Sequence, residues 1–412
     1  MKRIVLIGNG FDIAHGMKTK YSDFLEDLWQ NIYKEARACT TGSAYEHDLI
    51  SITKIPHEWF GNNNHNDFNI SLQRIHQTIR FKNNFFKLIS ESQRLKSWVD
   101  IETEYYEQLK KIYRQERGAT SIYKLNSDFE KITSYLSKYL TTIETSFTRG
   151  TRQEKYIDRV REIIDSDFIL KDFCEESINF KVDMEFEKIS NDIHSLETDV
   201  LTMQELDFEK SKLISKLGYD KSKNGLRKIL LSRDASYYFN LQPTETLFLN
   251  FNYTSTEDLY KQNVFAQNKS IHIHGSLKPQ DKNPIIFGFG DELDEEYKSI
   301  ENLNDNQYLE NIKSIKYLET DNYKELLEYV NSGAYQIIIF GHSCGNSDRT
   351  LLNTIFEHKN CVSIKPYYYQ ISKERDNYSD IIRNISRNFN NKVTMRDKVV
   401  NKKYCEPLLY ID

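Results

Sequence analysis

The sequence has 412 residues, of which 39% are hydrophobic and 28% charged, and its formal net charge is −5. This length suits roughly two or three domains, and the mild acidity excludes a general attraction to nucleic acid or anionic membranes. No apolar run of about eighteen residues occurs, and the apolar residues 4–7 are too few for a signal peptide. The five cysteines form no CxxC pair, which disfavours a disulfide framework and a zinc ribbon. We therefore expect a soluble, cytoplasmic protein without a membrane span.

The first predicted element is a buried strand over residues 2–7, which runs directly into Gly8-Asn9-Gly10-Phe11-Asp12. A strand that ends in paired glycines is typical of nucleotide-binding α/β folds, because glycine permits a sharp turn and lets a phosphate approach the backbone N–H groups. The usual dinucleotide fingerprint is absent, since Ile13 occupies the place of its third glycine. The acidic residues near its expected carboxylate fall in a predicted helix over residues 22–38. An ordinary dehydrogenase is therefore disfavoured.

The chain divides into three predicted blocks. Residues 1–66 form the first part of an α/β nucleotide-binding domain, ending in an Asn-rich loop at 61–66. Residues 67–240 are almost free of glycine and proline, and their apolar residues recur at helical spacing, as in Phe129, Ile132, Leu136 and Leu140. We predict that this block is a large helical insertion. Residues 241–412 form the remainder of the α/β domain.

Short apolar strands alternate with helices in this last block. The strands are predicted at residues 246–251, 270–274, 284–287, 336–340 and 361–365. The helices are predicted at residues 255–261, 311–330, 347–358 and 373–389. Alternation of this kind predicts a mostly parallel sheet covered on both faces, which the strand at 2–7 must join because it is not stable alone.

Unusual polar residues follow each of five predicted strands. Ligands bind at the carboxyl ends of strands in open parallel sheets, so these residues are expected to converge on one rim. The five segments are Gly8–Asp12, Asn250–Thr254, His272–Ser276, Gly288–Glu292 and Gly341–Asp348.

The order and spacing of these segments resemble the sirtuin-type NAD-binding fold. Gly8, Gly10 and Gly16 keep the spacing of the sirtuin glycine loop. Asn252-Tyr253-Thr254 resembles the sirtuin Asn-Ile-Asp motif, and His274-Gly275 resembles its His-Gly pair. Residues 284–292 and Gly341-His342-Ser343 resemble two later motifs. The resemblance implies an α/β fold with a sirtuin-like, Rossmann-type, mostly parallel sheet and a large inserted helical region.

A closer resemblance is to the AbiH family of bacterial phage abortive-infection proteins. The Gly-Asn-Gly-Phe-Asp start is followed here by Gly16, Thr19, Tyr21 and Asp23-Phe24. The segments at 251–254, 274–276 and 340–343 also resemble that family. The chain lacks the zinc-binding cysteine pairs of sirtuins, and Thr254 replaces their acidic residue, which disfavours protein deacetylation. The resemblances together imply cleavage of NAD to nicotinamide and ADP-ribose during antiviral defence.

If NAD is the ligand, His274 and Asn252 are the candidate catalytic residues. The unperturbed pKa of histidine lies near neutrality, so His274 is suited to act as a base, although a histidine at a strand end also serves as a structural cap. Asn252 is expected to orient the ribose and a water molecule, and its structural alternative is an Asx-turn after a strand.

The remaining candidates are expected to bind the dinucleotide. Gly8, Asn9 and Gly10 are assigned to the diphosphate, with a tight turn that needs no ligand as the alternative. Asp12 either hydrogen-bonds a ribose or fixes the loop. The resemblance places Gly341 and Ser343 near the adenosine.

Other polar residues have weaker claims. His342 and Asp348 are alternative contributors to catalysis. His272 and His274 alternate on a predicted strand but have no evident third metal ligand, so we predict no metal. Asp100, Glu102 and Glu104 lie in the helical block. Asp100 and Glu104 are four apart on one helix face, which is interpreted as solvated, with a helix that forms a lid over the pocket as the alternative.

Three functions compete at this point. The first is an NAD-consuming abortive-infection effector, gated by homo-oligomerisation or by a phage-derived trigger. The second is a sensor that binds NAD or ADP-ribose without hydrolysis. The third is a nucleic-acid-directed toxin, which the overall charge and the lack of a carboxylate cluster suited to metal disfavour.

Overall fold

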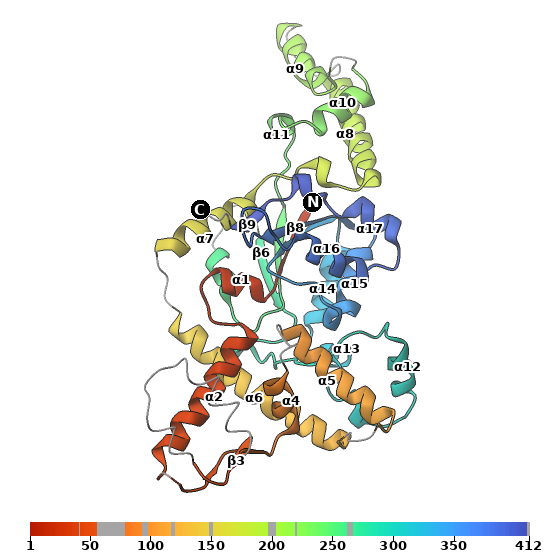
Figure 1. Ribbon diagram of the computed structural model, residues 1–412. Helices are drawn as coiled ribbons and strands as arrows, with labels where there is room; N and C mark the ends of the chain where they lie inside the picture. The colour runs from red at the N-terminus through yellow and green to blue at the C-terminus, as the bar shows by residue number, and fades with distance from the viewer. Residues whose placement is uncertain are drawn as a thin grey trace.

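The computed structural model describes residues 1–40, 42–55, 79–92, 98–116, 120–147, 151–196, 203–218, 221–261 and 267–409. In this part of the chain a six-stranded sheet is surrounded by helices, and a small three-stranded sheet lies apart from it (Figure 1). No helix among these residues has the length and apolar character needed to cross a membrane.

The large sheet has the strand order β6-β5-β1-β7-β8-β9, and each recorded strand pair is parallel. Its strands are β1 (Lys2–Ile7), β5 (Glu245–Asn250), β6 (Gln267–His272), β7 (Tyr335–Phe340), β8 (Cys361–Tyr369) and β9 (Pro407–Leu409). The predicted α/β class with a mostly parallel sheet is therefore confirmed, while its sirtuin-like character stays a prediction.

Strand β1 lies at the centre of the sheet and is buried on both faces. Ile4 and Leu6 point into one core, whereas Val5 and Ile7 point into the other. Alternate residues of a strand face opposite sides, so a run that is apolar at every position is what a doubly covered parallel strand requires. The unbroken apolar run of residues 4–7 in β1 thus explains its central place.

A second layer of the molecule lies beyond the carboxyl ends of the strands, below the sheet in Figure 1. Its core combines α2, α4, α5 and α6 with the small sheet. Helix α1 (Asn9–Ala14) packs on the large sheet through Phe11. The helices of the second layer are α2 (Tyr21–Ala38), α4 (Asn84–Glu91), α5 (Trp98–Tyr113) and α6 (Ile122–Ser146), and the small sheet has β2 (Tyr45–Glu46), β3 (Ile50–Ile52) and β4 (Ile79–Phe81). This layer covers the edge of the sheet at which the predicted site residues lie.

The next helices run from the sheet into an arm that projects from the top of Figure 1. They are α7 (Thr151–Asp165), α8 (Glu175–Leu196), α9 (Met203–Ser215), α10 (Lys223–Leu230) and α11 (Ala235–Tyr238). Helix α7 packs on the sheet through Tyr156 and Val160. The buried guanidinium of Arg3 donates from Nη1 to the carbonyls of Ile163 (3.2 Å), Ile164 (2.6 Å) and Ser166 (2.9 Å), so it caps the carboxyl end of α7.

Further helices occur between and after the later strands of the sheet. They are α12 (Glu295–Glu301), α13 (Lys313–Lys316), α14 (Asn322–Asn331), α15 (Arg349–Glu357), α16 (Tyr378–Arg387) and α17 (Lys392–Lys398). Short 3-10 helices occur at Leu170–Asp172, Thr256–Tyr260, Pro279–Asp281, Asn306–Leu309, Tyr317–Glu319, Asn346–Asp348 and Lys402–Tyr404. The predicted split into blocks at residues 66 and 240 stays a prediction.

Two predicted elements were wrong. Residues 284–287 form no strand, and Ile286 instead donates its N–H to the His274 carbonyl (2.8 Å) while Phe287 stacks on Phe129. The apolar run reflects burial between two cores rather than strand pairing. The helix expected at 311–330 is broken into α13, a 3-10 turn and α14, because residues 320–321 interrupt it.

Candidate active site

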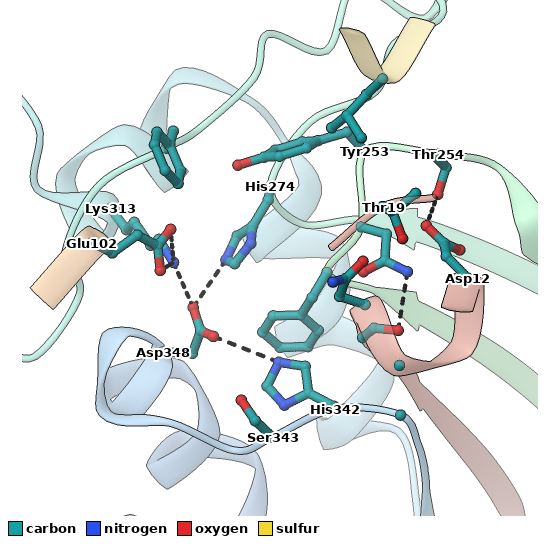
Figure 2. A pocket seen from close by; sticks show the side chains of 18 residues that line it. Asp12, Thr19, Glu102, Tyr253, Thr254, His274, Lys313, His342, Ser343 and Asp348 are labelled. Carbon is teal, nitrogen blue, oxygen red and sulfur yellow. Dashed lines mark hydrogen bonds and ion pairs between the residues drawn. The ribbon is translucent and has the colours of Figure 1, made fainter. Parts of the chain in front are cut away.

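A cavity of about 240 Å³ opens between the carboxyl ends of the parallel strands and the helical layer above them (Figure 2). It is lined by loops that follow β1, β5, β6 and β7, and by α5, α6 and α13. The structure brings all the predicted site residues to this one cavity: Gly8, Asn9, Gly10, Asp12, Asn252, His274, Gly341 and Ser343. Their chemical roles stay predictions.

The glycines hold two loops in direct contact. Gly10 donates its N–H to the Gly341 carbonyl (2.9 Å). A Cβ added at Gly10 would lie 2.8 Å from the Gly341 Cα. Gly341 has a φ of +68°, and a Cβ there would lie 2.1 Å from the Phe11 nitrogen. Close packing of the loops therefore requires these glycines whether or not a phosphate binds them. The N–H of Asn9 donates to no residue in the described ranges.

Asp12 fastens the glycine loop to the loop after β5. Its carboxylate is 1% exposed and accepts hydrogen bonds from Thr254 Oγ1 (2.6 Å) and Thr256 Oγ1 (2.7 Å). Burial raises the pKa of Asp12 to about 6, against the opposing effect of these two hydroxyls and of Asn252. The contacts favour the loop-fixing alternative for Asp12. The residue also lines the cavity.

Asn252 and Ser343 lie on the cavity wall in different ways. Asn252 is buried and donates from Nδ2 to the Gly8 carbonyl (3.1 Å), so it ties the loop after β5 to the glycine loop. Ser343 is exposed, and its carbonyl accepts a hydrogen bond from Asn384 Nδ2 (2.7 Å). The amide of Asn252 is therefore rigidly placed, whereas the Ser343 side chain faces solvent.

A buried cluster of charges closes one side of the cavity (Figure 2). Lys313 Nζ lies 2.8 Å from Asp348 Oδ1 and 2.8 Å from Glu102 Oε1. The three side chains are between 1% and 6% exposed. One ammonium group is thus shared by two carboxylates from different layers, because Glu102 comes from α5 and Asp348 from the loop after β7.

Two histidines flank the Asp348 carboxylate. His274 Nε2 lies 3.2 Å from Asp348 Oδ1 and 3.1 Å from the Tyr317 hydroxyl. His342 Nε2 lies 3.5 Å from Asp348 Oδ2, and its Nδ1 accepts the N–H of Cys344 (3.0 Å). A carboxylate only accepts hydrogen bonds, so each neutral ring carries its proton on Nε2. No described residue hydrogen-bonds Nδ1 of His274.

The charges set the protonation of this cluster. Burial, reinforced by Lys313, lowers the pKa of His274 to about 4, so the ring is neutral at pH 7. Burial alone would raise the pKa of Asp348, but Lys313 and His274 outweigh it and hold that pKa well below its usual value. Burial raises the pKa of Glu102 to about 7, although Lys313 opposes the shift. Asp348 is therefore the permanently ionised carboxylate of the cluster.

Sequence reasoning missed Glu102 and Lys313 as site residues. From the sequence, the helix face of Asp100 and Glu104 is interpreted as solvated and Glu102 is given no role, but the Glu102 side chain is buried against Lys313. Its position in the helix carried a signal, since Glu102 falls on the same stripe as the buried residues Tyr106 and Leu109. A lone carboxylate in an apolar stripe indicates a buried ionic partner. No comparable signal marked Lys313.

His272 belongs to a different environment from His274. It ends β6, and its Nε2 lies 2.8 Å from Glu257 Oε1, whereas His274 lies in the turn beyond the strand. The expected alternation along one strand therefore does not apply to the pair. The described ranges hold no group of three or more His, Cys, Asp or Glu residues arranged to bind a metal ion.

Fold and site together define an α/β protein with a buried ionic cavity at the carboxyl ends of a parallel sheet. Residues 4–370 match the family described as Bacteriophage abortive infection AbiH, and the chain belongs to this family. No curated protein and no solved structure matches the chain.

Proposed function

We propose that this chain is an abortive-infection effector that cleaves NAD to nicotinamide and ADP-ribose in a sirtuin-like site. Membership of the AbiH family supports the defence role. The observation that carries the chemical part is the gathering of Asn252 and His274 with the glycine loop in one cavity, beside the ionised carboxylate of Asp348.

The chemistry follows from the placement of His274 and Asp348. Cleavage breaks the bond between ribose C1′ and the nicotinamide nitrogen, and the bonding electrons leave with nicotinamide. Water adds to C1′ of the resulting oxocarbenium-like ribose, and its proton passes to Nδ1 of His274. Asp348 holds the ring by Nε2 and favours the imidazolium that forms, as the aspartate of a catalytic triad does. Burial and Lys313 oppose it more strongly, so the proton leaves the ring readily for solvent. Asn252 orients the ribose.

The charges of the cavity also separate the candidate ligands. Lys313 is the lysine of the described lining, and both Glu102 and Asp348 already neutralise it. A nucleic-acid strand requires several cations along its phosphates. The cavity instead suits a compact ligand whose reacting centre becomes positively charged, which favours NAD over a polynucleotide.

Nicotinamide release from NAD by the purified protein tests this function. We expect release by wild type and a loss of at least about 100-fold in His274→Ala and Asn252→Ala, the range over which a proton-transfer group contributes. His358→Ala is the matched control, because His358 stands at the carboxyl end of α15 and does not line the cavity. We expect it to retain wild-type activity.

The same assay distinguishes the other functions. Protein concentration is varied and phage lysate is added, because we propose that oligomerisation or a phage-derived trigger gates activity. NAD binding without release under every condition would favour the sensor. Release that survives both His274→Ala and Asn252→Ala would exclude this cavity as the site of hydrolysis.

A further inference from the structure

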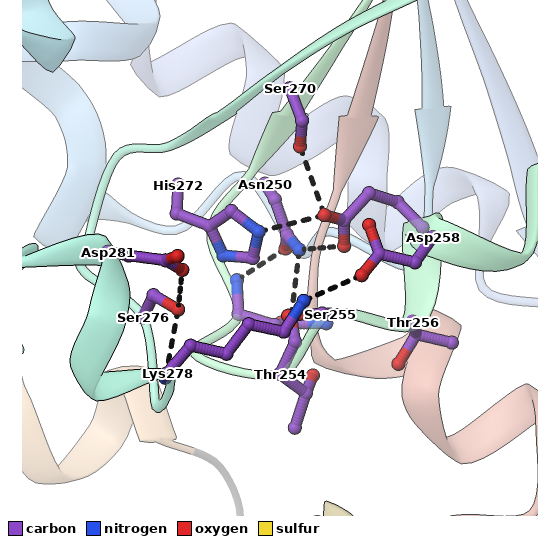
Figure 3. Close-up of polar contacts among 12 residues, drawn as sticks. Asn250, Thr254, Ser255, Thr256, Asp258, Ser270, His272, Ser276, Lys278 and Asp281 are labelled. Atoms are coloured by element: carbon purple, nitrogen blue, oxygen red, sulfur yellow. Dashed lines mark hydrogen bonds and ion pairs between the residues drawn. The ribbon is translucent and has the colours of Figure 1, made fainter. Parts of the chain in front are cut away.

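We infer that Glu257 is a positioning residue that orients Asn252 through the side-chain amide of Asn250. The inference rests on the proposed role of Asn252 at the ribose, and it names residues that do not line the cavity. Glu257 lies in the 3-10 helix Thr256–Tyr260 and Asn250 is the last residue of β5, and a hydrogen bond joins their side chains. Figure 3 shows Asn250 among polar side chains that include Ser270 and His272.

The amide of Asn250 uses its donor and acceptor groups in defined directions. Its Nδ2 donates to Glu257 Oε2 (2.7 Å) and to the Thr254 carbonyl (3.0 Å). Its Oδ1 accepts the backbone N–H of Asn252 (2.8 Å). The last bond forms an Asx-turn made by Asn250, whereas the sequence indicates such a turn only as the alternative role of Asn252. Asn250 thus bonds the loop at both Asn252 and Thr254.

Glu257 favours one of the two orientations of the Asn250 side-chain amide. A carboxylate accepts hydrogen bonds and donates none, so Nδ2 of Asn250 has to point toward Glu257. Oδ1 then has to point toward the N–H of Asn252. The Thr254 carbonyl and the N–H of Asn252 favour the same orientation, so a neutral amide at position 257 would keep it but would weaken the bond that anchors Nδ2, and the turn would be held less firmly.

Glu257 is itself held as an ionised group. Its side chain is fully buried, and Oε1 lies 2.8 Å from His272 Nε2 and 3.3 Å from Lys261 Nζ. Ser270 Oγ donates to the same oxygen (3.0 Å). These partners offset the cost of burying the charge, and they explain why a histidine stands at the end of β6 without lining the cavity.

A change in the Asn250 turn would be transmitted to the cavity by two hydrogen bonds of the same loop. Asn252 Nδ2 donates to the Gly8 carbonyl, and Thr254 Oγ1 donates to Asp12. A turn that changes its arrangement therefore shifts the Asn252 amide relative to the glycine loop. A small displacement of a positioned group lowers the rate of the chemical step more than it lowers the affinity for substrate.

The test compares Glu257→Gln with Asp258→Asn. Asp258 is the next carboxylate in the chain and pairs with Lys261 and Lys278, but it makes no contact with Asn250. We expect Glu257→Gln to lower kcat about tenfold or more with KM within about twofold of wild type. Asp258→Asn is expected to leave both constants near wild type.

An NMR measurement reports the conformation of the Asn250 turn independently of catalytic activity. Protein labelled with ¹⁵N-asparagine gives a backbone amide resonance for Asn252, and loss of the bond to Asn250 Oδ1 moves it. We expect this resonance to move in Glu257→Gln and to stay in place in Asp258→Asn. Asn250→Ser is a second variant, because serine accepts the N–H two residues on but is too short to reach Glu257. It is expected to lower kcat as Glu257→Gln does.

The outcomes separate this inference from the proposed function. If wild type releases nicotinamide but Glu257→Gln changes neither kcat nor the Asn252 resonance more than Asp258→Asn does, the positioning role is overturned and the hydrolase stands. If wild type releases none while the resonance moves only in Glu257→Gln and Asn250→Ser, the turn is positioned as inferred and the hydrolase fails.

Discussion

At the scale of single residues, Asp348 organises the cavity. Its carboxylate contacts Lys313, His274 and His342, three side chains that arise from three separate segments of the chain. Removing any one partner leaves a buried charge or donor unpaired, which costs more than an exposed ion pair contributes. The cluster is therefore a fixed unit rather than a set of independent charges.

Glu102 makes the stability of the protein depend on pH. Its pKa is raised to about 7 in the folded protein from an ordinary value of 4.5. A raised pKa gives a contribution to stability that is complete below the unfolded value and is lost as pH rises through the folded value. We expect the free energy of unfolding of wild type, relative to Glu102→Gln, to fall between about pH 4.5 and 7. Denaturant titrations across this range measure the difference. A difference that grows with pH would contradict it.

The residues recovered from sequence share one property: they stand directly after strands. Gly8, Asn252 and Gly341 follow apolar strands and His274 follows the more polar β6, and parallel strands bring their ends together. Glu102 and Lys313 stand inside helical sequence, where the folded partner decides whether a charge is solvated. Their pairing depends on contacts 211 residues apart, which no local pattern contains.

At the scale of elements, the ends of β1 serve opposite purposes. Its carboxyl end delivers the glycine loop to the cavity, whereas Arg3 near its amino end caps α7. A cation at the carboxyl end of a helix also interacts favourably with the helix dipole. The sheet thus holds the helix that covers one of its faces by a charged contact as well as by apolar packing.

This capping gives a prediction for α7. We expect Arg3→Met to lower the free energy of unfolding by about 3 kcal/mol, because several buried carbonyls lose a charged donor. Hydrogen exchange is expected to quicken at the carboxyl end of α7. Lys2→Met is the control, since the partly exposed pair of Lys2 with Glu245 contributes about 1 kcal/mol at most. Equal losses in the two variants would contradict the capping role.

Strand prediction succeeded where burial and pairing coincide, as in β1, β5 and β7. It failed at residues 284–287, because the same apolar composition fills the space between two cores without a neighbouring strand to pair with. The break between α13 and α14 was also missed, since both flanks keep helical spacing. Periodicity reports which residues are buried and leaves open what covers them.

At the scale of the whole molecule, the sheet joins segments from both ends of the chain. Ile4 of β1 is paired with Leu247 of β5 on one side and with Ile337 of β7 on the other. The helical layer, formed largely by residues between β1 and β5, then supplies Glu102 to the finished rim. The cavity is complete only when β1 is paired with both β5 and β7 and the helical layer that carries Glu102 is packed against them.

This strand order governs when the protein can act during its own synthesis. A ribosome that adds about 5–20 residues per second needs tens of seconds to pass from β1 to Asp348. Until then β1 lacks a neighbour on one side, and the carboxylate that holds His274 does not yet exist. Unfinished chains therefore carry no working cavity. The topology of the sheet therefore postpones completion of the cavity until β7 and the segment that carries Asp348 have been synthesised.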